Sequence, residues 1–168
     1  MGFVTRFRVT VSKAMLAPDW ARVTINKVPS FGAQMTNNFT KAGFDLGIVT
    51  TNGDAMLEFY KDVIGLHFEA TISMEALGVA AMHRLWANDS LLKIVVPTKQ
   101  VTSGTSGGMM GSTGLRYFTL SVGDVGSAIE LCRSAGAAII WERKEARPGV
   151  VVGMVEDPDG NWVEFVEK

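Results

Sequence analysis

The stretch FDLGIVTTNGDAMLEFYKDVIGL, residues 44–66, changes its hydrophobic period partway along. In its first part apolar and polar positions alternate, so that Leu46 lies on the face opposite Asp45, which is typical of a strand. Its second part has apolar side chains at helical spacing and ends at a glycine, a residue suited to a helix C-terminus. The stretch therefore predicts a strand over 43–51 followed by a helix over 54–65.

The same order of elements occurs twice along the chain. Three further strands are predicted in the first half, and the second half again reads as a strand, a helix and three strands. This repetition predicts two consecutive βαβββ modules, residues 43–97 and 114–168. The linker between them, residues 98–113, is rich in Gly, Ser and Thr and lacks any period, which predicts a flexible linker or a lid. The fold class is therefore α+β.

Residues 1–42 differ from the rest because they carry six Lys or Arg side chains and a single acid, Asp19. Three interpretations of this N-terminal extension stay open. It is an arm that pairs with a sheet edge or a partner subunit, a targeting segment, or, for residues 1–34, an artefactual extension ahead of Met35.

Composition excludes several classes of function. The net charge of −1 gives no electrostatic basis for binding nucleic acid, and no apolar run approaches the roughly 18 residues of a membrane span. Cys132 is the only cysteine, so an intrachain disulfide is excluded and a reducing compartment is favoured. We therefore expect a cytoplasmic protein that acts on small molecules.

Two short motifs carry a family resemblance. FYKDVIGL at 59–66 and DPDGNWVEF at 157–165, within the duplicated pattern, resemble the vicinal oxygen chelate superfamily of glyoxalases, bleomycin-resistance proteins and extradiol dioxygenases. The resemblance covers residues 43–168. It implies that the two modules form a U-shaped sheet enclosing a cavity, and that the protein is a homodimer. Function is left open, because this fold hosts several chemistries and some members that only bind ligands.

The resemblance also marks four positions where family members usually carry metal ligands. Here they are Asp45, Lys93, Tyr117 and Glu164, at matching points of the two modules. A charged lysine repels a cation, and a neutral tyrosine is a poor ligand. We therefore expect no metal cofactor; if one binds, we expect a divalent ion near Asp45 and Glu164.

Without a metal, the same four residues suit acid–base chemistry. One acid, Glu164 or Asp45, is a candidate general base, while Lys93 and Tyr117 stabilise a developing oxyanion. The competing interpretation is an internal salt bridge that only maintains the shape of the cavity. Four further residues are candidates for substrate binding: Arg84, Trp86, Arg116 and Trp162. A simple hairpin at residues 87–90 places Arg84 on the side of Lys93 and His83 on the other side, whereas a β-bulge exchanges them.

Three functions follow from these residues. The first is a metal-independent isomerase, epimerase or lyase acting on a small, partly hydrophobic carbonyl compound. The second is a non-catalytic protein of the same fold that binds a drug or antibiotic. The third is a metal-dependent enzyme of the glyoxalase or dioxygenase type.

Overall fold

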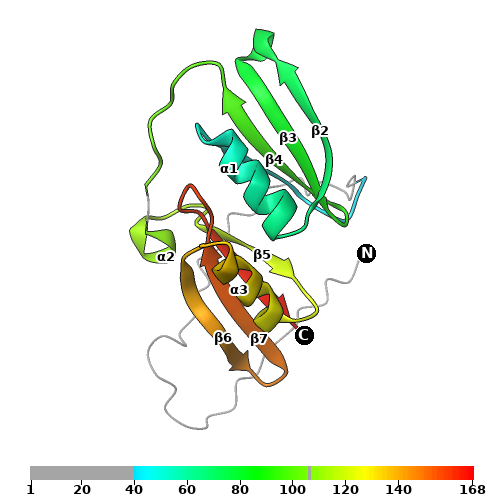
Figure 1. Cartoon of the computed structure of the whole chain (residues 1–168), viewed down its shortest axis with the longest axis vertical. Coiled ribbons are helices and arrows are strands. Elements are labelled where there is room, and N and C mark those ends of the chain that lie inside the picture. Colours follow the sequence, from blue (N-terminus) through cyan, green and yellow to red (C-terminus); the bar gives the residue numbers. More distant parts are fainter. Residues whose placement is uncertain (1–39, 106) are drawn as a thin grey trace, which may run out of the picture. The chain divides into compact units, whose positions relative to one another are not determined.

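The structure is a computed structural model that describes residues 40–105 and 107–168 (Figure 1). The predicted N-terminal extension, residues 1–42, lies outside the described residues except for its last three.

Residues 43–97 form the first βαβββ module. Its elements are β1 (Asp45–Val49), α1 (Gly53–Glu58), the π-helix η2 (Phe59–Val63), β2 (His67–Met74), the short 3-10 helix η3 (Glu75–Leu77), β3 (Val79–Ala87) and β4 (Ser90–Pro97). The strand order is β1-β4-β3-β2, with β1 parallel to β4 and the other pairs antiparallel.

The second module repeats this arrangement after the linker, which contains the short helix α2 (Gly108–Gly111). Its elements are β5 (Tyr117–Ser121), α3 (Val125–Ser134), β6 (Ile139–Arg147), β7 (Val150–Glu156) and β8 (Trp162–Glu167). The order β5-β8-β7-β6, with β5 parallel to β8, matches that of the first sheet. The predicted tandem βαβββ architecture is therefore confirmed.

Local sequence explains most of these elements. The alternation in β1 leaves Asp45 exposed and Leu46 half-buried, as expected for a strand with one face against the core. Gly65 and Gly136 both follow helical segments and both have φ of 82°, a conformation that favours glycine at a helix C-terminus.

Three boundaries differ from the prediction. The segment expected as one helix over 54–65 consists of the α-helix α1 and the π-helix η2. The first of the three strands expected after the second helix, for which the sequence indicates residues near 137–142, continues to Arg147 as β6. The linker contains the four-residue helix α2, where no regular element was expected.

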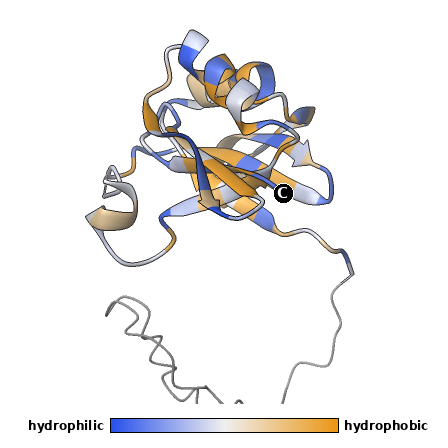
Figure 2. Ribbon diagram, turned by 90° about the horizontal axis from the view of Figure 1, so that it is seen from below, coloured by the Kyte–Doolittle hydropathy of each residue, from blue (hydrophilic) through white to orange (hydrophobic). Residues whose placement is uncertain are grey.

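The hydrophobic core joins the two modules. Buried side chains of α1 and η2, including Met56 and Tyr60, belong to one cluster with Val125 and Ile129 of α3 and with inward-facing strand residues. In Figure 1 α1 and α3 each lie across the sheet of their own module, and Figure 2 shows that the strands beneath these helices are largely hydrophobic. The opposite faces of the sheets are therefore the ones left for other contacts.

A buried hydrogen bond also links the modules. The Tyr60 hydroxyl donates to Asp157 Oδ2 over 2.7 Å. Asp157 in turn accepts hydrogen bonds from the backbone N–H groups of Asp159 and Asn161. The carboxylate thereby fixes the turn that leads directly into β8.

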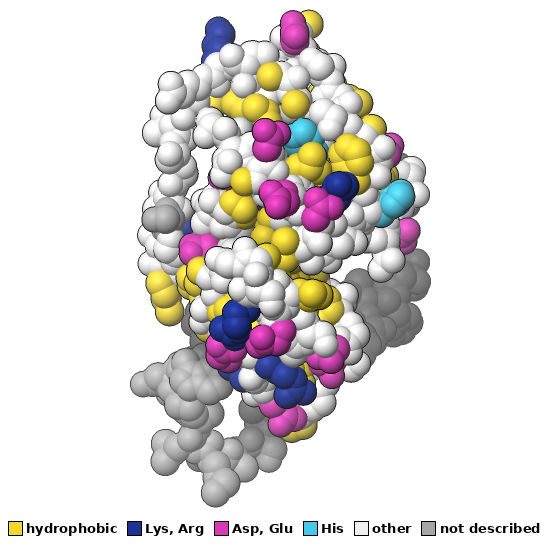
Figure 3. Space-filling model, in the orientation of Figure 1, with side chains coloured by type: hydrophobic (Ala, Val, Ile, Leu, Met, Phe, Trp, Pro, Cys, Tyr) yellow, Lys and Arg dark blue, Asp and Glu magenta, His cyan; other side chains and the backbone are white. Residues whose placement is uncertain are grey.

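No helix in the described part of the chain is long and apolar enough to cross a membrane. On the face shown in Figure 3, basic and acidic side chains are interspersed, without a large patch of one sign.

Candidate functional site

The four predicted site residues lie on strands at the sheet faces opposite the helices. In the first sheet Lys93 is paired in register with Gly47 and lies on the same face as Asp45. In the second sheet Tyr117 is paired with Trp162, and Thr119 with Glu164. Strand alternation thus gives both modules the facing expected from the sequence.

In the first module the acid is held by two ammonium groups. Lys93 Nζ lies 3.0 Å from Asp45 Oδ2, and Lys41 contacts the other carboxylate oxygen of Asp45. These hydrogen bonds, from Lys41 first and Lys93 second, hold the pKa of the Asp45 carboxyl below its ordinary value. Asp45 is therefore an ionised partner of two lysines and a poor proton acceptor.

The remaining polar groups of this face form a second cluster. Glu69 Oε2 accepts hydrogen bonds from Trp86 Nε1 at 2.6 Å and Arg84 Nε at 3.0 Å, and these two bonds lower the pKa of Glu69. Lys41 Nζ lies 5.1 Å from the centroid of the Trp86 ring, within cation–π range. Arg84 and Trp86 are therefore engaged with protein groups on the same face as Lys93.

His83 lies on the other face, beside α1. It is buried, its Nδ1 is 2.7 Å from Thr71 Oγ1, and burial lowers its pKa. The hairpin after Ala87 pairs Arg84 with Lys93 and His83 with Ile94, which settles the facing that the sequence left open.

In the second module the acid has a neutral partner. The Thr119 hydroxyl donates to Glu164 Oε2 over 2.6 Å, and no ion pair involves Glu164 within the described ranges. Glu164 is paired across the sheet with buried Met154. Tyr117, which is 39% exposed, lies one pair further along the same face, next to Trp162.

The hollows of this region place the residues in separate groups. Asp45 and Thr119 line a hollow at one end of β1 and β5. Tyr117 and Trp162 line a slot of about 210 Å³ that also takes in Leu46, Ile48 and Leu115. Within the structure as described, no hydrogen bond or ion pair joins Asp45 and Lys93 to Tyr117 and Glu164. Both hollows are lined by residues of β1 and β5, and each of them takes in a different part of the predicted set.

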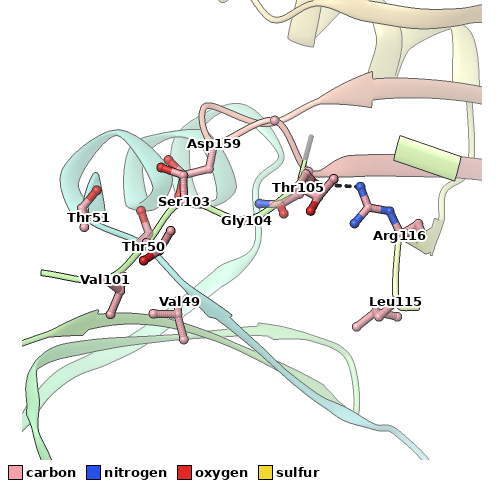
Figure 4. A pocket seen from close by; sticks show the side chains of 13 residues that line it. Val49, Thr50, Thr51, Val101, Ser103, Gly104, Thr105, Leu115, Arg116 and Asp159 are labelled. Atoms are coloured by element: carbon pink, nitrogen blue, oxygen red, sulfur yellow. Dashed lines mark hydrogen bonds between the residues drawn. The ribbon is translucent and has the colours of Figure 1, made fainter. Parts of the chain in front are cut away.

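A third hollow, of about 250 Å³, lies beneath the linker (Figure 4). Its lining includes Thr50, Ser103 and Asp159. Arg116 borders it and donates hydrogen bonds to two linker carbonyls, Thr105 O at 2.7 Å and Gly108 O at 2.8 Å. Arg116 therefore binds the linker, and its expected contact with a substrate stays a prediction.

The residues at the family's ligand positions do not fit a divalent cation. Lys93 directs its ammonium group at Asp45, and Lys41 neutralises the same carboxylate, so an added cation there meets two like charges. Between residues 40 and 168, Ser106 excepted, no three His, Cys, Asp or Glu side chains gather closely enough to hold a metal ion.

Sequence reasoning missed three members of this region: Lys41, Glu69 and Thr119. The signal for Thr119 was present, because it lies two residues after Tyr117 and therefore on the same face of a strand. Lys41 precedes the first strand, and Glu69 lies where the register between β2 and β3 shifts. Alternation alone places neither of these two.

Comparison with known proteins supports the fold. A sequence model of the Glyoxalase/Bleomycin resistance protein/Dioxygenase superfamily matches residues 44–165, whereas no curated protein matches the chain.

Similar solved structures include a glyoxalase family protein from Bacillus cereus, at a TM-score of 0.67 and 15% identity, covering 80% of this chain and 98% of that one. The glyoxalase family protein from Enterococcus faecalis gives 0.57 and 16%, covering 80% and 100%. Lactoylglutathione lyase from Agrobacterium tumefaciens gives 0.54 and 19%, covering 75% and 92%. At these identities the likeness concerns the fold alone. Because the family model spans both modules, the chain belongs to the Glyoxalase/Bleomycin resistance protein/Dioxygenase superfamily.

Proposed function

We propose that this protein is a metal-independent enzyme that moves a proton next to the carbonyl group of a small, partly hydrophobic compound, as an isomerase, epimerase or lyase. Glu164 is the general base of this proposal, and Tyr117 is the hydrogen-bond donor to the carbonyl oxygen.

The observation that carries the proposal is the different pairing of the two acids. Asp45 is bound by two lysines, whereas Glu164 accepts a hydrogen bond from the neutral hydroxyl of Thr119. A carboxylate clamped between cations loses their stabilisation when it takes up a proton, while Glu164 keeps its neutral partner in either state. The sequence left the choice of base open between these acids, and their pairing favours Glu164.

The proposed reaction follows from this assignment. Glu164 accepts the proton from the carbon next to the carbonyl, and the electron pair of the broken C–H bond forms an enolate whose charge rests on oxygen. Tyr117 donates a hydrogen bond to that oxygen. The proton then returns to the same or a neighbouring carbon, which gives epimerisation or isomerisation, or the enolate expels a leaving group from the next carbon, which gives elimination.

Binding without catalysis is the second candidate, and one observation favours it. Tyr117 is 39% exposed, and Leu115 beside the slot is 76% exposed, so water reaches this region in the single chain. An exposed slot with apolar walls suits the capture of a hydrophobic ligand, whereas proton abstraction from carbon benefits from the exclusion of water.

Exchange of carbon-bound protons for deuterium tests the first proposal. Phenylpyruvate and phenylacetaldehyde serve as probes in D₂O, with loss of the proton signal followed by NMR. We expect the protein to accelerate exchange, and Glu164→Gln to lower that acceleration by about 10² or more, with Asp45→Asn as the matched control of smaller effect. Acceleration that is unchanged in Glu164→Gln would remove Glu164 as the base, and retained binding without any exchange would favour the second candidate.

Metal independence and assembly are tested separately. Exchange activity that survives EDTA supports the metal-free proposal, whereas loss with EDTA and recovery with Mn²⁺ or Ni²⁺ contradicts it.

We also propose that the protein is a homodimer, for which light scattering of the full chain gives the mass.

A further inference from the structure

Trp162 is an aromatic neighbour of the proposed base on the same face of its strand. It lies two residues before Glu164 on the same face of β8 and is paired with Tyr117 of β5. Its ring also lines the slot between β1 and β5. The orientation of this indole therefore affects any ligand that reaches Glu164.

The backbone of Gly108 lies directly against this indole. A Cβ atom added at Gly108 would overlap Cδ2 and Cε2, the two ring-fusion carbons of Trp162. Gly108 is buried, and its φ of 51° is in the left-handed region that favours glycine. Both the close approach and the backbone conformation thus require the absence of a side chain at this position.

Arg116 fixes the Gly108 backbone in turn. Its Nε donates to the Gly108 carbonyl over 2.8 Å. Its Nη2 donates to the Thr105 carbonyl over 2.7 Å, the bond drawn as a dashed line in Figure 4. Two bonds from one planar guanidinium define the orientation of the group as well as its distance. Arg116 directly precedes Tyr117, so the start of β5 is tied to the segment that supports Trp162.

We propose that Arg116 and Gly108 are positioning residues that hold the Trp162 indole as a fixed stacking surface for a planar aromatic or conjugated group of the ligand. Gly108 covers the ring-fusion carbons of the indole, and Trp162 also lines the slot, where a ligand can meet it. The ligand class rests on the proposed function, because that function puts a ligand beside Glu164. The positioning of the indole by Arg116 and Gly108 does not depend on it.

Fluorine NMR tests the positioning without any ligand. The full chain is labelled with 5-fluorotryptophan, and Trp162→Phe identifies the resonance of Trp162. We expect Gly108→Ala and Arg116→Gln to shift or broaden that resonance by more than its linewidth, while Arg116→Lys, which keeps one donor group, restores part of the wild-type signal. Gly104→Ala is the matched control, because nothing lies within 4 Å of a Cβ at Gly104. A Trp162 resonance that is the same in wild type, Gly108→Ala and Arg116→Gln would overturn the positioning.

The same label tests the ligand class. Phenylpyruvate should shift the Trp162 resonance through the ring current of its phenyl group, and pyruvate should not. We expect Trp162→Leu to weaken phenylpyruvate binding by about threefold to tenfold, measured by titration calorimetry. Equal effects of phenylpyruvate and pyruvate on Trp162 would overturn the stacking role. Failure of the proton-exchange reaction with an intact Trp162 response would instead count against the proposed catalysis alone.

Discussion

The two modules share one topology but differ at their equivalent positions. In the first, Asp45 and Lys93 form an ion pair joined by Lys41. In the second, Tyr117 and Glu164 stand at the matching points, and Glu164 has a hydroxyl partner. The two modules therefore differ in the surroundings of their acids: one acid is paired with two cations, and the other lacks a cationic partner among the described residues.

The two acids therefore differ in what they can do chemically. An ion pair holds its members in place and leaves neither available for proton transfer, whereas a carboxylate with a hydroxyl donor keeps lone pairs for a substrate. In the proposed function, the ion pair of the first module therefore supports the site, and the acid of the second module takes part in the reaction.

The two tyrosines give the largest contrast. Burial raises the pKa of Tyr60 well above its ordinary value, and the nearby Asp157 carboxylate acts in the same direction, so the hydroxyl remains a donor at neutral and alkaline pH. Tyr60→Phe removes that donor from a buried carboxylate and should lower the free energy of unfolding by about 2 kcal/mol.

Tyr117→Phe is the control, because Tyr117 is partly exposed. It should change the free energy of unfolding by less than about 0.5 kcal/mol. Urea unfolding measures both variants. If Tyr60→Phe lowers the free energy of unfolding as little as Tyr117→Phe does, the contact between the modules does not depend on the Tyr60 hydroxyl.

The N-termini of the two helices give a smaller contrast. Asp124 caps α3 by accepting hydrogen bonds from Ser127, and its pKa is lowered mainly by the bond from the Ser127 backbone N–H. Asn52 precedes α1 without a side-chain cap. Asp124→Ala should lower Tm by a few degrees, and Asn52→Ala by less.

The pH dependence of the Asp124 effect has a defined sign. A lowered pKa in the folded state means that the cap stabilises fully above the ordinary aspartate pKa, about 3.9, and that the contribution is lost as pH falls through the lower folded value. Thermal melts of Asp124→Ala and wild type should therefore converge in acid. A difference in Tm that persists unchanged at the lowest pH would point to helix propensity as the cause.

The sequence carried enough information for the fold and for the facing of the site. The alternation of side chains in the strands is a local pattern, and so is a glycine at the end of a helix, such as Gly65 or Gly136. A strong local pattern predicts the element that the folded chain contains. The π-helix η2 was missed because its inward-facing Phe59 and Tyr60 also satisfy an α-helical period. Periodicity over so short a segment does not separate the two helix types.

The site was predicted only in part for a physical reason. Facing is a local property of a strand, so Asp45 and Glu164 were placed on the correct sides. Which side chains form hydrogen bonds or ion pairs with one another depends instead on their proximity in the folded chain. The bond between Arg116 and the Gly108 carbonyl depends on how a glycine-rich linker returns to β5, and a segment without period contains no signal for its path. For the same reason Lys41, which precedes β1, was not expected beside Asp45.

The two histidines sharpen the comparison of buried and exposed positions. Burial lowers the pKa of His83, and Asp54 opposes this more weakly. The folded protein therefore binds a proton at His83 less readily than the unfolded chain, whose histidines titrate near about 6.5. Stability should be fully present above that pH and fall as the pH decreases below it.

His83→Gln should reduce this dependence, while His67→Gln, at an exposed position, should retain it. Urea midpoints at pH 8 and pH 5 provide the measurement. If the urea midpoint changes between pH 8 and pH 5 by the same amount in His83→Gln and in wild type, a group other than His83 causes the pH dependence.

The smallest effect on stability, and the most direct test of the contrast between the modules, concerns Lys93. Because Asp45 and Lys93 are both partly exposed, their ion pair should add little to stability, so Lys93→Met should leave Tm nearly unchanged. It should still raise the pKa of Asp45, by removing one of two donors, while Lys41 keeps that pKa below the ordinary value. Carbon-13 NMR of the carboxyl groups follows this titration, and high salt should act in the same direction as the substitution because it screens exposed charges. The Glu164 resonance is the internal control. If Lys93→Met moves the titration of Glu164 as much as that of Asp45, the two modules share one electrostatic site, and the division between a supporting half and a chemical half is lost.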